Sequence, residues 1–379
     1  MKILNVNMTL DPVTGGGSAE RTLQLSRALN RAGHQSTILT INTGLSPAYL
    51  QQCRDWGLEV VALPSLWKRF YIPKPSQHLI QKLVAGADIV NLMSHWTLIN
   101  ALVYRSVTKL AKPYTVCPAG ALPIFGRSMI LKKSYNYFIG RRMILHANGH
   151  IAIAPNELEH FKFYGVHPGM VTLISNGIDP EDFSEGAGNK FRARYGIGDA
   201  PLILFLGRLN IIKGPDMLLN AFCRCSQDER MKRCHLVFAG PDGGMLDELK
   251  RMVDSAGMKD RIHFIGHIGG RKKSEAYWAA DFLAIPSRQE AMSIVVLEAG
   301  ITGTPVLITD QCGFDDVAAV EGGMVVAASV KGLQEGLLAM AGNPAKLKIM
   351  GQNLEHFTRE HFLWNHMVNR YLELFSRIM

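Results

Sequence analysis

Residues 202–225 have the sequence LILFLGRLNIIKGPDMLLNAFCRC, which combines three different patterns in one short stretch. The apolar run Leu202–Leu206 predicts a β-strand, and the glycine-bounded segment Gly207–Gly214 predicts a loop. A helix is expected from about Pro215 to Cys225, because proline is favoured in the first helical turn. The stretch therefore predicts the strand–loop–helix unit from which parallel α/β sheets are built.

The N-terminus of the chain repeats this unit. Lys2–Met8 predicts a strand and Gly15–Gly17 a loop, and a helix is expected from about Ser18 to Ala32. Ser18 suits the N-cap of this helix, and Gly33 suits the position just after its end. The apolar segment His34–Asn42 predicts the next strand of the same sheet.

Strands and helices alternate along both halves of the chain, with further strands expected at His235–Ala239 and Ile262–Ile265. This alternation predicts an α/β fold of two doubly wound, Rossmann-like domains. A chain of 379 residues is long enough for both. A polar turn at Ile174–Asp179 marks the boundary. We therefore expect an N-terminal domain of residues 1–175 and a C-terminal domain of residues 176–362.

The glycine-rich loops do not fit two common nucleotide-binding motifs. In a dinucleotide fingerprint a third glycine would follow Gly15 and Gly17, but that position is Glu20. The second strand would also end in an acidic residue that binds ribose, and here it ends in Thr40, Ile41 and Asn42. A P-loop is excluded because GRLNIIKG lacks the required Gly-Lys-Ser/Thr ending.

Residues 286–310, PSRQEAMSIVVLEAGITGTPVLITD, carry two glutamates separated by seven residues. A helix is expected to begin at about Ser293 and to run to about Gly300. Backbone N–H groups at such a helix start can bind a phosphate. Glu290 would precede this helix and Glu298 would lie about one turn inside it, where each carboxylate can accept hydrogen bonds from sugar hydroxyls.

With these motifs the chain resembles the GT-B glycosyltransferases of the large retaining family four. Glu290 and Glu298 match the E-x7-E motif of that family, and Arg208 and Lys213 match its G-R-x-x-x-x-K-G loop. Further matches are Gly303–Val306, Gly240, Phe264, Gly266, Ala280–Asp281, Pro286–Ser287 and, more weakly, Gly15–Gly17, Asn176–Asp179 and His95.

The resemblance implies two facing domains with the active site in the cleft between them. Arg208 and Lys213 would hold the donor diphosphate and neutralise the charge that develops as it leaves, which is an effect on the transition state. Glu290 would bind the transferred sugar and Glu298 the ribose of the donor. The full set of expected donor-binding residues is Gly16, Gly17, Gly207, Gly240, His267, Ile268, Met292, Ser293, Ile294, Val295 and Glu298.

The acceptor side of the site is less defined. His95 and Gly120 are the residues expected there, although a lone histidine is more often structural. Family members commonly have a histidine or aspartate after the fourth strand of the N-terminal domain, whereas this chain has Cys117, Pro118, Ala119 and Gly120. Retaining members are thought to use the departing phosphate as the base. Ala291–Ser293 also departs from the usual family sequence, which leaves the donor sugar open.

The charge of the chain is concentrated in its first half. Residues 1–175 contain 18 lysines and arginines against 7 acidic residues, and the remainder contains 23 against 25. Such a surplus attracts anionic partners. The six cysteines show no metal-ligand spacing and are expected to be reduced thiols, and no bound metal is expected. The N-terminal segment predicts a strand rather than a signal peptide, and no apolar run is long enough for a membrane span.

Two segments of the N-terminal domain combine cations with large apolar residues: LWKRFYIPK at 66–74 and FGRSMILKKSYNYFIGRRMIL at 125–145. Basic amphipathic segments of this kind suit an anionic membrane surface. An ordinary helix with a solvated basic face remains the alternative, and nucleic acid is not expected because no recognition motif is present. The cations expected at a membrane are Lys68, Arg69, Arg127, Lys132, Lys133, Arg141 and Arg142.

These patterns lead to one functional hypothesis with two alternatives. The chain is expected to be a cytoplasmic, metal-independent glycosyltransferase, peripheral at the inner face of the membrane. It would use a nucleotide-sugar donor in cell-surface polysaccharide or lipid-linked glycan synthesis. The alternatives are a glycosyltransferase acting on small soluble molecules and a catalytically silent sugar-nucleotide-binding protein of the same fold. The C-terminal helix, from about Leu363 to Ile378, is expected to return to the N-terminal domain.

Overall fold

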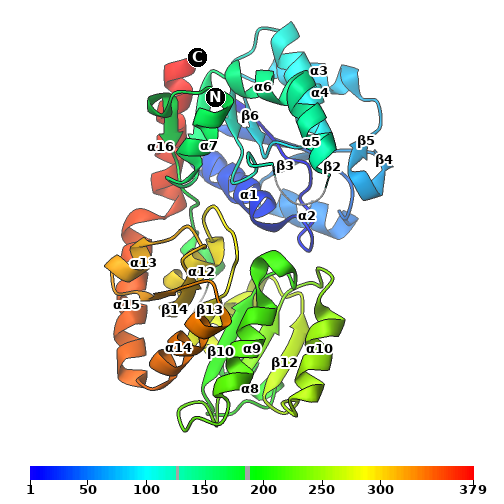
Figure 1. Cartoon of the computed structure of the whole chain (residues 1–379). Coiled ribbons are helices and arrows are strands. Elements are labelled where there is room, and N and C mark those ends of the chain that lie inside the picture. Colours follow the sequence, from blue (N-terminus) through cyan, green and yellow to red (C-terminus); the bar gives the residue numbers. More distant parts are fainter. Residues whose placement is uncertain (125–127, 184–187) are drawn as a thin grey trace. The chain divides into compact units, whose positions relative to one another are not determined.

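The computed structural model describes residues 1–124, 128–183 and 188–379 (Figure 1). The chain forms two compact units. The N-terminal unit consists of Met1–Gly177 and Trp364–Met379, and the C-terminal unit consists of Ile178–Leu363. The sequence placed the corresponding breaks at 175/176 and near 363, and the C-terminal helix α16 (Trp364–Ile378) belongs to the N-terminal unit.

The N-terminal unit contains a seven-stranded sheet in the order β3-β2-β1-β6-β7-β8-β9, and every described pair in it is parallel. Its strands are β1 (Lys2–Val6), β2 (Gln35–Ile41), β3 (Glu59–Leu63), β6 (Ile89–Met93), β7 (Tyr114–Cys117), β8 (Gly149–Ala152) and β9 (Val171–Leu173). Strands β4 (Ser65–Trp67) and β5 (Ile72–Pro73) form a separate antiparallel pair.

Helices cover this sheet and connect its strands, as the crossovers of a parallel sheet require. They are α1 (Gly16–Arg31), α2 (Pro47–Asp55), α3 (Gln77–Gly86), α4 (Leu98–Lys109), α5 (Met129–Tyr135), α6 (Arg141–Leu145), α7 (Glu157–Tyr164) and α16. Short helical turns lie at η1 (Lys68–Phe70), η2 (Asn136–Gly140, a π-helix) and η3 (Pro168–Met170). Helix α16 packs on α1, so the two ends of the chain meet in this unit (Figure 1).

The C-terminal unit contains a six-stranded parallel sheet in the order β12-β11-β10-β13-β14-β15. Its strands are β10 (Leu202–Leu206), β11 (His235–Ala239), β12 (Ile262–Gly266), β13 (Phe282–Ile285), β14 (Val306–Thr309) and β15 (Gly323–Val326). Its helices are α8 (Gly188–Arg194), α9 (Pro215–Cys225), α10 (Leu246–Ser255), α11 (Gly270–Ala279), α12 (Ile294–Ile301), α13 (Asp316–Ala319), α14 (Val330–Ala341) and α15 (Pro344–His361), with short turns η4 (Pro180–Asp182) and η5 (Ile211–Lys213). The two parallel sheets confirm the predicted α/β class and its two Rossmann-like sheets.

The start of α1 differs from the expectation. The helix begins at Gly16 rather than Ser18, and Gly15 is its N-cap residue. Gly15 must lack a side chain, because a Cβ there would collide with the Asp11 carbonyl oxygen and with Ala19. The Gly15–Gly16 turn brings the chain into the helix two residues early, and the Ser18 hydroxyl donates to the Gly15 carbonyl from within the first turn. The predicted N-cap at Ser18 was therefore wrong, whereas Gly33 does end the helix with a φ of 82°.

One buried cation holds both chain segments that leave the N-terminal unit. Arg21 of α1 is 1% exposed. Its guanidinium donates to the carbonyl oxygens of Ile174 and Ser175 at 2.7 and 2.9 Å, to Asn176 Oδ1 at 2.8 Å and to the Tyr371 hydroxyl at 2.9 Å. The segment 174–176 and helix α16 are thus both fixed to α1.

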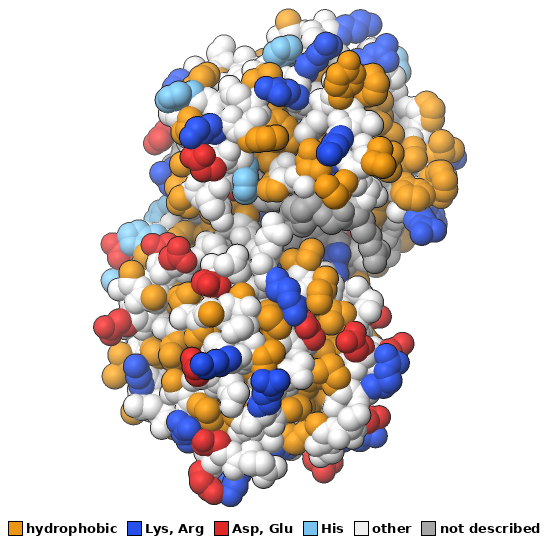
Figure 2. All heavy atoms as spheres, in the orientation of Figure 1, with side chains coloured by type: hydrophobic (Ala, Val, Ile, Leu, Met, Phe, Trp, Pro, Cys, Tyr) orange, Lys and Arg blue, Asp and Glu red, His pale blue; other side chains and the backbone are white. Residues whose placement is uncertain are grey.

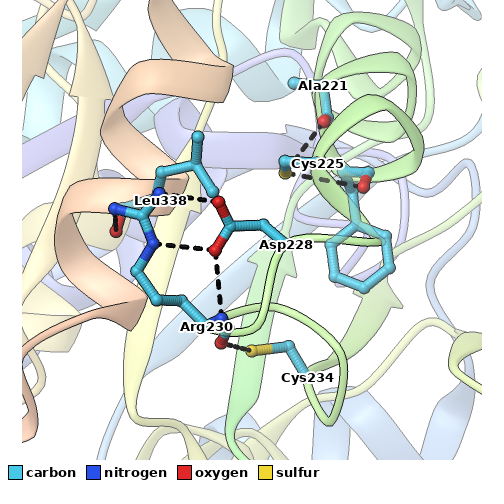
Figure 3. Close-up of polar contacts among 7 residues, drawn as sticks. Ala221, Cys225, Asp228, Arg230, Cys234 and Leu338 are labelled. Carbon is cyan, nitrogen blue, oxygen red and sulfur yellow. Dashed lines mark hydrogen bonds and ion pairs between the residues drawn. The ribbon is translucent and has the colours of Figure 1, made fainter.

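The connection between α9 and β11 is also fixed by polar contacts (Figure 3). Arg230 contacts Asp228 in a paired geometry and reaches the Leu338 carbonyl of α14 at 3.3 Å. The thiols of Cys225 and Cys234 donate to backbone carbonyls. Burial raises the pKa of both thiols to about 11, so they are neutral groups of the interior. The cysteines of the described residues are free, as the sequence led us to expect.

Candidate functional site

The site is built from loops that follow the strands of the C-terminal unit. The loop after β10 holds the expected cations. Its turn η5 is capped by the Asn210 side chain, which accepts from the Lys213 backbone N–H at 3.0 Å. Gly214 then has a φ of 66°, and a Cβ there would collide with the carbonyl oxygen of Pro286. This loop is therefore packed directly on the loop after β13, and the contact requires glycine.

That packing joins the two charged residues on which the functional hypothesis depends. Lys213 Nζ lies 2.6 Å from Glu290 Oε1, which also accepts a hydrogen bond from Ser287 Oγ at 2.5 Å. The Glu290 side chain is 9% exposed and that of Lys213 is 33% exposed. Burial, and then the charge of Glu290, raises the pKa of the nearby Cys312 to about 11. The low exposure of Glu290 shows that the pair is partly shielded from water. Charges interact more strongly in such a low-dielectric environment than in water.

A second ion pair fixes the same two loops. Both terminal nitrogens of Arg288 contact the Asp216 carboxylate, at 2.8 and 2.6 Å. Arg288 also donates to the carbonyl oxygens of Ile211 and Ile212 from its side chain and its backbone N–H. Because a bidentate arginine fixes orientation as well as distance, this pair sets how Lys213 and Glu290 meet.

The N-terminus of α12 lies just after Glu290. Ser293 is the N-cap residue and is 1% exposed, and its hydroxyl oxygen has no hydrogen-bond partner within the described part of the chain. The loop before it is packed tightly, since a Cβ at Gly313 would collide with the Ala291 carbonyl oxygen. The first backbone N–H groups of a helix have no partner inside the helix, and the helix dipole favours an anion there. The start of α12 therefore has the general features of an anion-binding helix N-terminus, as the sequence predicted for residues 292–295.

Glu298 lies deeper than the sequence suggested. The residue is 3% exposed, and each of its oxygens is already occupied. Lys273 Nζ donates to Oε1 and the Tyr277 hydroxyl donates to Oε2, both at 2.7 Å. Burial, and then the Glu298 charge, raises the pKa of Tyr277, so its proton stays on the hydroxyl. A carboxylate oxygen can accept more than one hydrogen bond, so a ribose hydroxyl can still be added.

A pocket of about 480 Å³ lies at the ends of β10, β11 and β12. Gly240 lines it with a φ of 151°, and a Cβ at this position would collide with the Gly207 carbonyl oxygen. Phe264 also lines it and stacks on Phe238 with the ring centroids 5.1 Å apart. His267 is a lining residue, whereas Ile268 is buried next to it. In open α/β sheets, ligands bind at this carboxyl edge of the strands.

The structure thus gathers most of the expected donor residues at one edge of one sheet. Arg208 is half-buried on the loop after β10, with its stem against Gly243. Gly16 and Gly17 belong to the N-terminal unit, where a Cβ at either position would meet no described atom within 4 Å. Gly16 has a φ of 63°, which itself favours glycine, whereas neither conformation nor packing inside that unit requires glycine at Gly17.

The two residues expected on the acceptor side, His95 and Gly120, both lie within the N-terminal unit. His95 is fully buried, and its Nε2 lies 2.9 Å from Asn136 Oδ1. Burial lowers the pKa of His95 to about 4, so the ring is neutral. This position argues against direct contact with an acceptor and gives His95 a structural place instead. Gly120 follows β7 with a φ of 83°, and its N–H donates to the buried carboxylate of Glu157.

Four residues that support the site were given no role from the sequence: Arg288, Lys273, Tyr277 and Ser287, the last of which was named only as part of the Pro286–Ser287 family match. Ser287 and Arg288 lie in the same loop as Glu290 and could have been suspected from that position alone. Lys273 and Tyr277 show only a four-residue spacing, which places them on one face of α11. Nothing in that spacing points to Glu298.

Comparison with known proteins finds family models that match both halves of the chain. The model of the family described as Glycosyltransferase Family 4 matches residues 15–182, and the model described as Glycosyl transferases group 1 matches residues 189–357. D-inositol 3-phosphate glycosyltransferase of Gordonia bronchialis is 30% identical over 230 residues, which cover 58% of this chain and 50% of that protein. D-inositol 3-phosphate glycosyltransferase 2 of Catenulispora acidiphila is 33% identical over 233 residues, which cover 58% and 53%. The chain therefore spans about half the length of these curated relatives.

Among solved structures, the chain is similar to Anabaena HepE in complex with UDP and glucose. The TM-score is 0.82 at 16% identity, and the match covers 100% of both chains. At this identity the likeness shows the fold. Because glycosyltransferase models match both halves of the sequence and the fold agrees over its whole length, the chain belongs to the glycosyltransferases of family 4 and group 1, with the GT-B fold.

Proposed function

We propose that the protein transfers a sugar from a nucleoside-diphosphate donor to an acceptor hydroxyl, with retention of configuration at the reacting carbon. The observation that carries the proposal is the pair of Lys213 Nζ and Glu290 Oε1, 2.6 Å apart, directly before the N-terminus of α12. A cation, a carboxylate and the first N–H groups of a helix suit a ligand in which a diphosphate is joined to a sugar. Retention rests on the family resemblance.

Each part of the donor has a group that suits it. The diphosphate would lie on Arg208, Lys213 and the backbone of residues 292–295. The two cations would offset the negative charge that grows on the leaving diphosphate, an effect typically worth on the order of 10²–10³ in rate for one such group. Glu290 would bind hydroxyls of the sugar, and Glu298 those of the ribose. The base of the nucleotide would enter the pocket beside Gly240 and His267.

UDP is the first nucleotide to test, since HepE is described in complex with UDP and glucose. We propose a UDP-sugar donor and a reaction that needs no divalent metal. Glycosyl transfer in the presence of excess EDTA is expected to stay within about twofold of the untreated rate, because Arg208 and Lys213 would already supply the positive charge. A loss of activity restored by Mg²⁺ or Mn²⁺ would contradict metal independence while leaving the transfer reaction in place.

For the acceptor we favour a glycan or lipid-linked glycan of the cell surface, reached at the inner face of an anionic membrane. The charge surplus of residues 1–175 supports this choice. A second candidate is a small phosphorylated polyol, because the curated relatives are named D-inositol 3-phosphate glycosyltransferases. The same positive surplus would attract such an acceptor.

The test begins with the donor. Thermal unfolding should be measured with UDP-, GDP- and ADP-sugars, because a ligand that binds the folded state raises Tm. The stabilising donor is then used in hydrolysis and transfer assays, with D-inositol 3-phosphate and a lipid-linked glycan as separate acceptors. We expect turnover by the wild type and a fall of about 10²–10³-fold in Lys213→Ala. Lys232→Ala, which removes a surface cation 49% exposed, is the matched control.

Two results would overturn the proposal. If no nucleotide-sugar raises Tm, the C-terminal unit does not contain a donor-binding site. If a donor binds but neither wild type nor Lys213→Ala turns it over, the chain is a silent nucleotide-sugar-binding protein. Transfer to D-inositol 3-phosphate alone would favour the second acceptor candidate over the first.

A further inference from the structure

Residues 129–145 form one continuous helical run through α5, η2 and α6, and its outer surface is unusually apolar. Six large hydrophobic side chains are exposed there: Met129 by 46%, Ile130 by 80%, Leu131 by 69%, Tyr137 by 81%, Phe138 by 71% and Leu145 by 41%. Scattered single hydrophobic residues on a surface need no explanation, but a contiguous group of this size marks an interaction site.

The run is held in place from its inner side, so this exposure is not the result of a loosely attached helix. Met143 and Ile144 are fully buried, and Tyr135 and Ile139 pack against the core of the N-terminal unit. The Tyr135 hydroxyl donates to the Thr97 carbonyl at 3.1 Å. The outward direction of the remaining side chains is therefore set by packing.

The π-turn η2 contains Tyr137 and Phe138, the two highly exposed aromatic residues of this run. Inside it, Asn136 points inward, with Oδ1 2.9 Å from His95 Nε2 and its amide donating to the Tyr164 hydroxyl at 2.6 Å. A Cβ at Gly140 would approach both Asn136 and the Tyr135 ring, so the turn requires glycine there. Tyr137 and Phe138 thus project from a turn that Asn136 anchors to His95 in the loop after β6 and to Tyr164 of α7. π-turns are frequent at functional sites.

The charges on this surface select the kind of partner. Residues 129–145 contain Lys132, Lys133, Arg141 and Arg142 and no acidic residue. Strand β4 and the turn η1 after it have a similar composition, with Leu66, Trp67 and Phe70 exposed by 64%, 57% and 54% beside Lys68 and Arg69. Figure 2 shows hydrophobic side chains gathered on the visible face of the N-terminal unit, with lysine and arginine side chains among them. Arg127 lies outside the described residues.

We infer that Ile130, Leu131, Tyr137 and Phe138 insert into the interface of an anionic lipid bilayer, with the four cations of residues 129–145 at the level of the head groups. Helices that lie in a membrane interface combine these features: apolar side chains that enter the acyl boundary and cations that meet anionic lipid. No helix within the described residues is long and apolar enough to cross a membrane. This inference rests on the membrane part of the proposed function and adds an apolar component to it.

The apolar component has a distinct signature. Salt screens the attraction between exposed cations and lipid head groups, but it does not weaken the burial of apolar area. Binding should therefore fall with salt to a plateau rather than to zero. The plateau is carried by the four hydrophobic residues, and the salt-sensitive part by the cations.

The experiment is co-sedimentation of the full chain with vesicles of phosphatidylcholine containing about one third phosphatidylglycerol, at low and high salt. Three variants are compared with the wild type. Tyr137→Ser/Phe138→Ser removes the aromatic pair, and Arg141→Gln/Arg142→Gln removes two cations. Phe163→Ser is the control, because Phe163 is 77% exposed on α7, outside the 129–145 run. Thermal unfolding and nucleotide-induced changes in Tm establish that each variant is folded.

We expect the aromatic variant to lose about tenfold or more of its vesicle affinity at high salt, given the apolar area removed. The arginine variant should lose binding mainly at low salt, and the control should bind as the wild type does. The inference is overturned if wild-type binding vanishes at high salt, or if the aromatic variant binds like the wild type at both salts. Self-association lost in the aromatic variant, without vesicle binding by the wild type, would assign the surface to a second copy instead.

These outcomes are separable from the proposed reaction, because vesicle binding needs no turnover. A chain that binds vesicles as expected but no nucleotide-sugar would keep the inference and lose the proposed function. A chain that hydrolyses a donor but does not bind vesicles would keep the proposed function and lose the inference.

Discussion

Lys213 Nζ and Glu290 Oε1 lie 2.6 Å apart, although 77 positions of sequence separate the two residues. Two neighbouring contacts hold them there: the close approach of Gly214 to Pro286 and the bidentate pair of Arg288 and Asp216. Because each residue of the pair is the nearest opposite charge of the other, neither should act independently in the reaction.

We therefore predict that the kinetic effects of Lys213→Ala and Glu290→Ala are not additive. Each substitution alone removes one group and leaves the other without its partner, whereas the double variant removes both. The loss in kcat/KM of the double variant should be smaller than the product of the single losses by a factor of about ten or more. Steady-state kinetics on the four proteins gives this coupling directly. Effects that multiply to within about threefold would show that the two groups act separately.

The hydrogen bonds that Lys273 and Tyr277 donate to the buried Glu298 predict that removing Lys273 lowers the stability of the protein. Lys273→Met leaves the Glu298 carboxylate buried with only the Tyr277 hydroxyl, and breaking such a buried pair typically costs about 3–5 kcal/mol. The free energy of unfolding, measured with urea, should fall by an amount of that order. Lys259→Met is the control, because the Lys259–Asp254 pair is exposed.

The same pair offers a rescue experiment. In Lys273→Met/Glu298→Gln the buried charge is removed together with its partner, so much of the lost stability should return. If the double variant is as unstable as Lys273→Met, the ion pair is not the reason for the loss.

Much of the fold could be predicted because it depends on local patterns. Strand β10 and helix α9 occupy the residues that the sequence indicated, since an apolar run, two glycines and a proline fix them locally. Strand β1 ends at Val6 rather than Met8, although the Asn7 N–H still donates to the Leu39 carbonyl, and the Asn7 side-chain amide donates to the Ser18 carbonyl and the Thr22 hydroxyl of α1. That contact is tertiary and leaves no mark in the strand itself.

The site shows the same division. The glutamates and the loop cations could be found from their spacing, which is a property of the motif. The burial of Glu298 and its contact with Lys273 could not, because they depend on how closely α11 approaches α12. The sequence left His95 open between two roles, and only its complete burial among Tyr135, Tyr164 and Asn136 favours the structural one.

A further prediction concerns the glycine that joins the two loops of the site. Gly214→Ala should lower both stability and activity, because the new Cβ would collide with the Pro286 carbonyl oxygen and push the loop of Lys213 away from Glu290. Gly257→Ala is a matched control, since Gly257 has a φ of 63° against 66° at Gly214 and open space around it. Both variants carry a strain of about 1–2 kcal/mol from the positive φ. In urea unfolding, only Gly214→Ala should lose more stability than this strain accounts for. It should also lose kcat/KM, whereas Gly257→Ala should not.

The last prediction uses the buried histidine of the N-terminal unit. Burial lowers the pKa of His95 from its ordinary value of 6.5 to about 4, although the hydrogen bond to Asn136 opposes the shift. Below pH 6.5 the unfolded chain binds a proton at this residue while the folded protein does not. Stability contributed by the neutral ring is therefore complete above pH 6.5 and is lost as the pH falls from 6.5 towards 4. The loss should reach about 3 kcal/mol, at about 1.4 kcal/mol for each pH unit.

His95→Asn isolates this effect, because its amide can still donate to Asn136 and does not titrate. The variant should be less stable than the wild type at pH 7.5, since it leaves space where the ring was packed. Its free energy of unfolding should then fall less steeply than that of the wild type between pH 6.5 and 4. Other buried histidines, such as His150, contribute equally to both proteins, so the difference between the two pH profiles reports His95 alone. Parallel profiles would mean that His95 is protonated in the folded protein at the same pH as in the unfolded chain, and the neutral, buried ring would be ruled out.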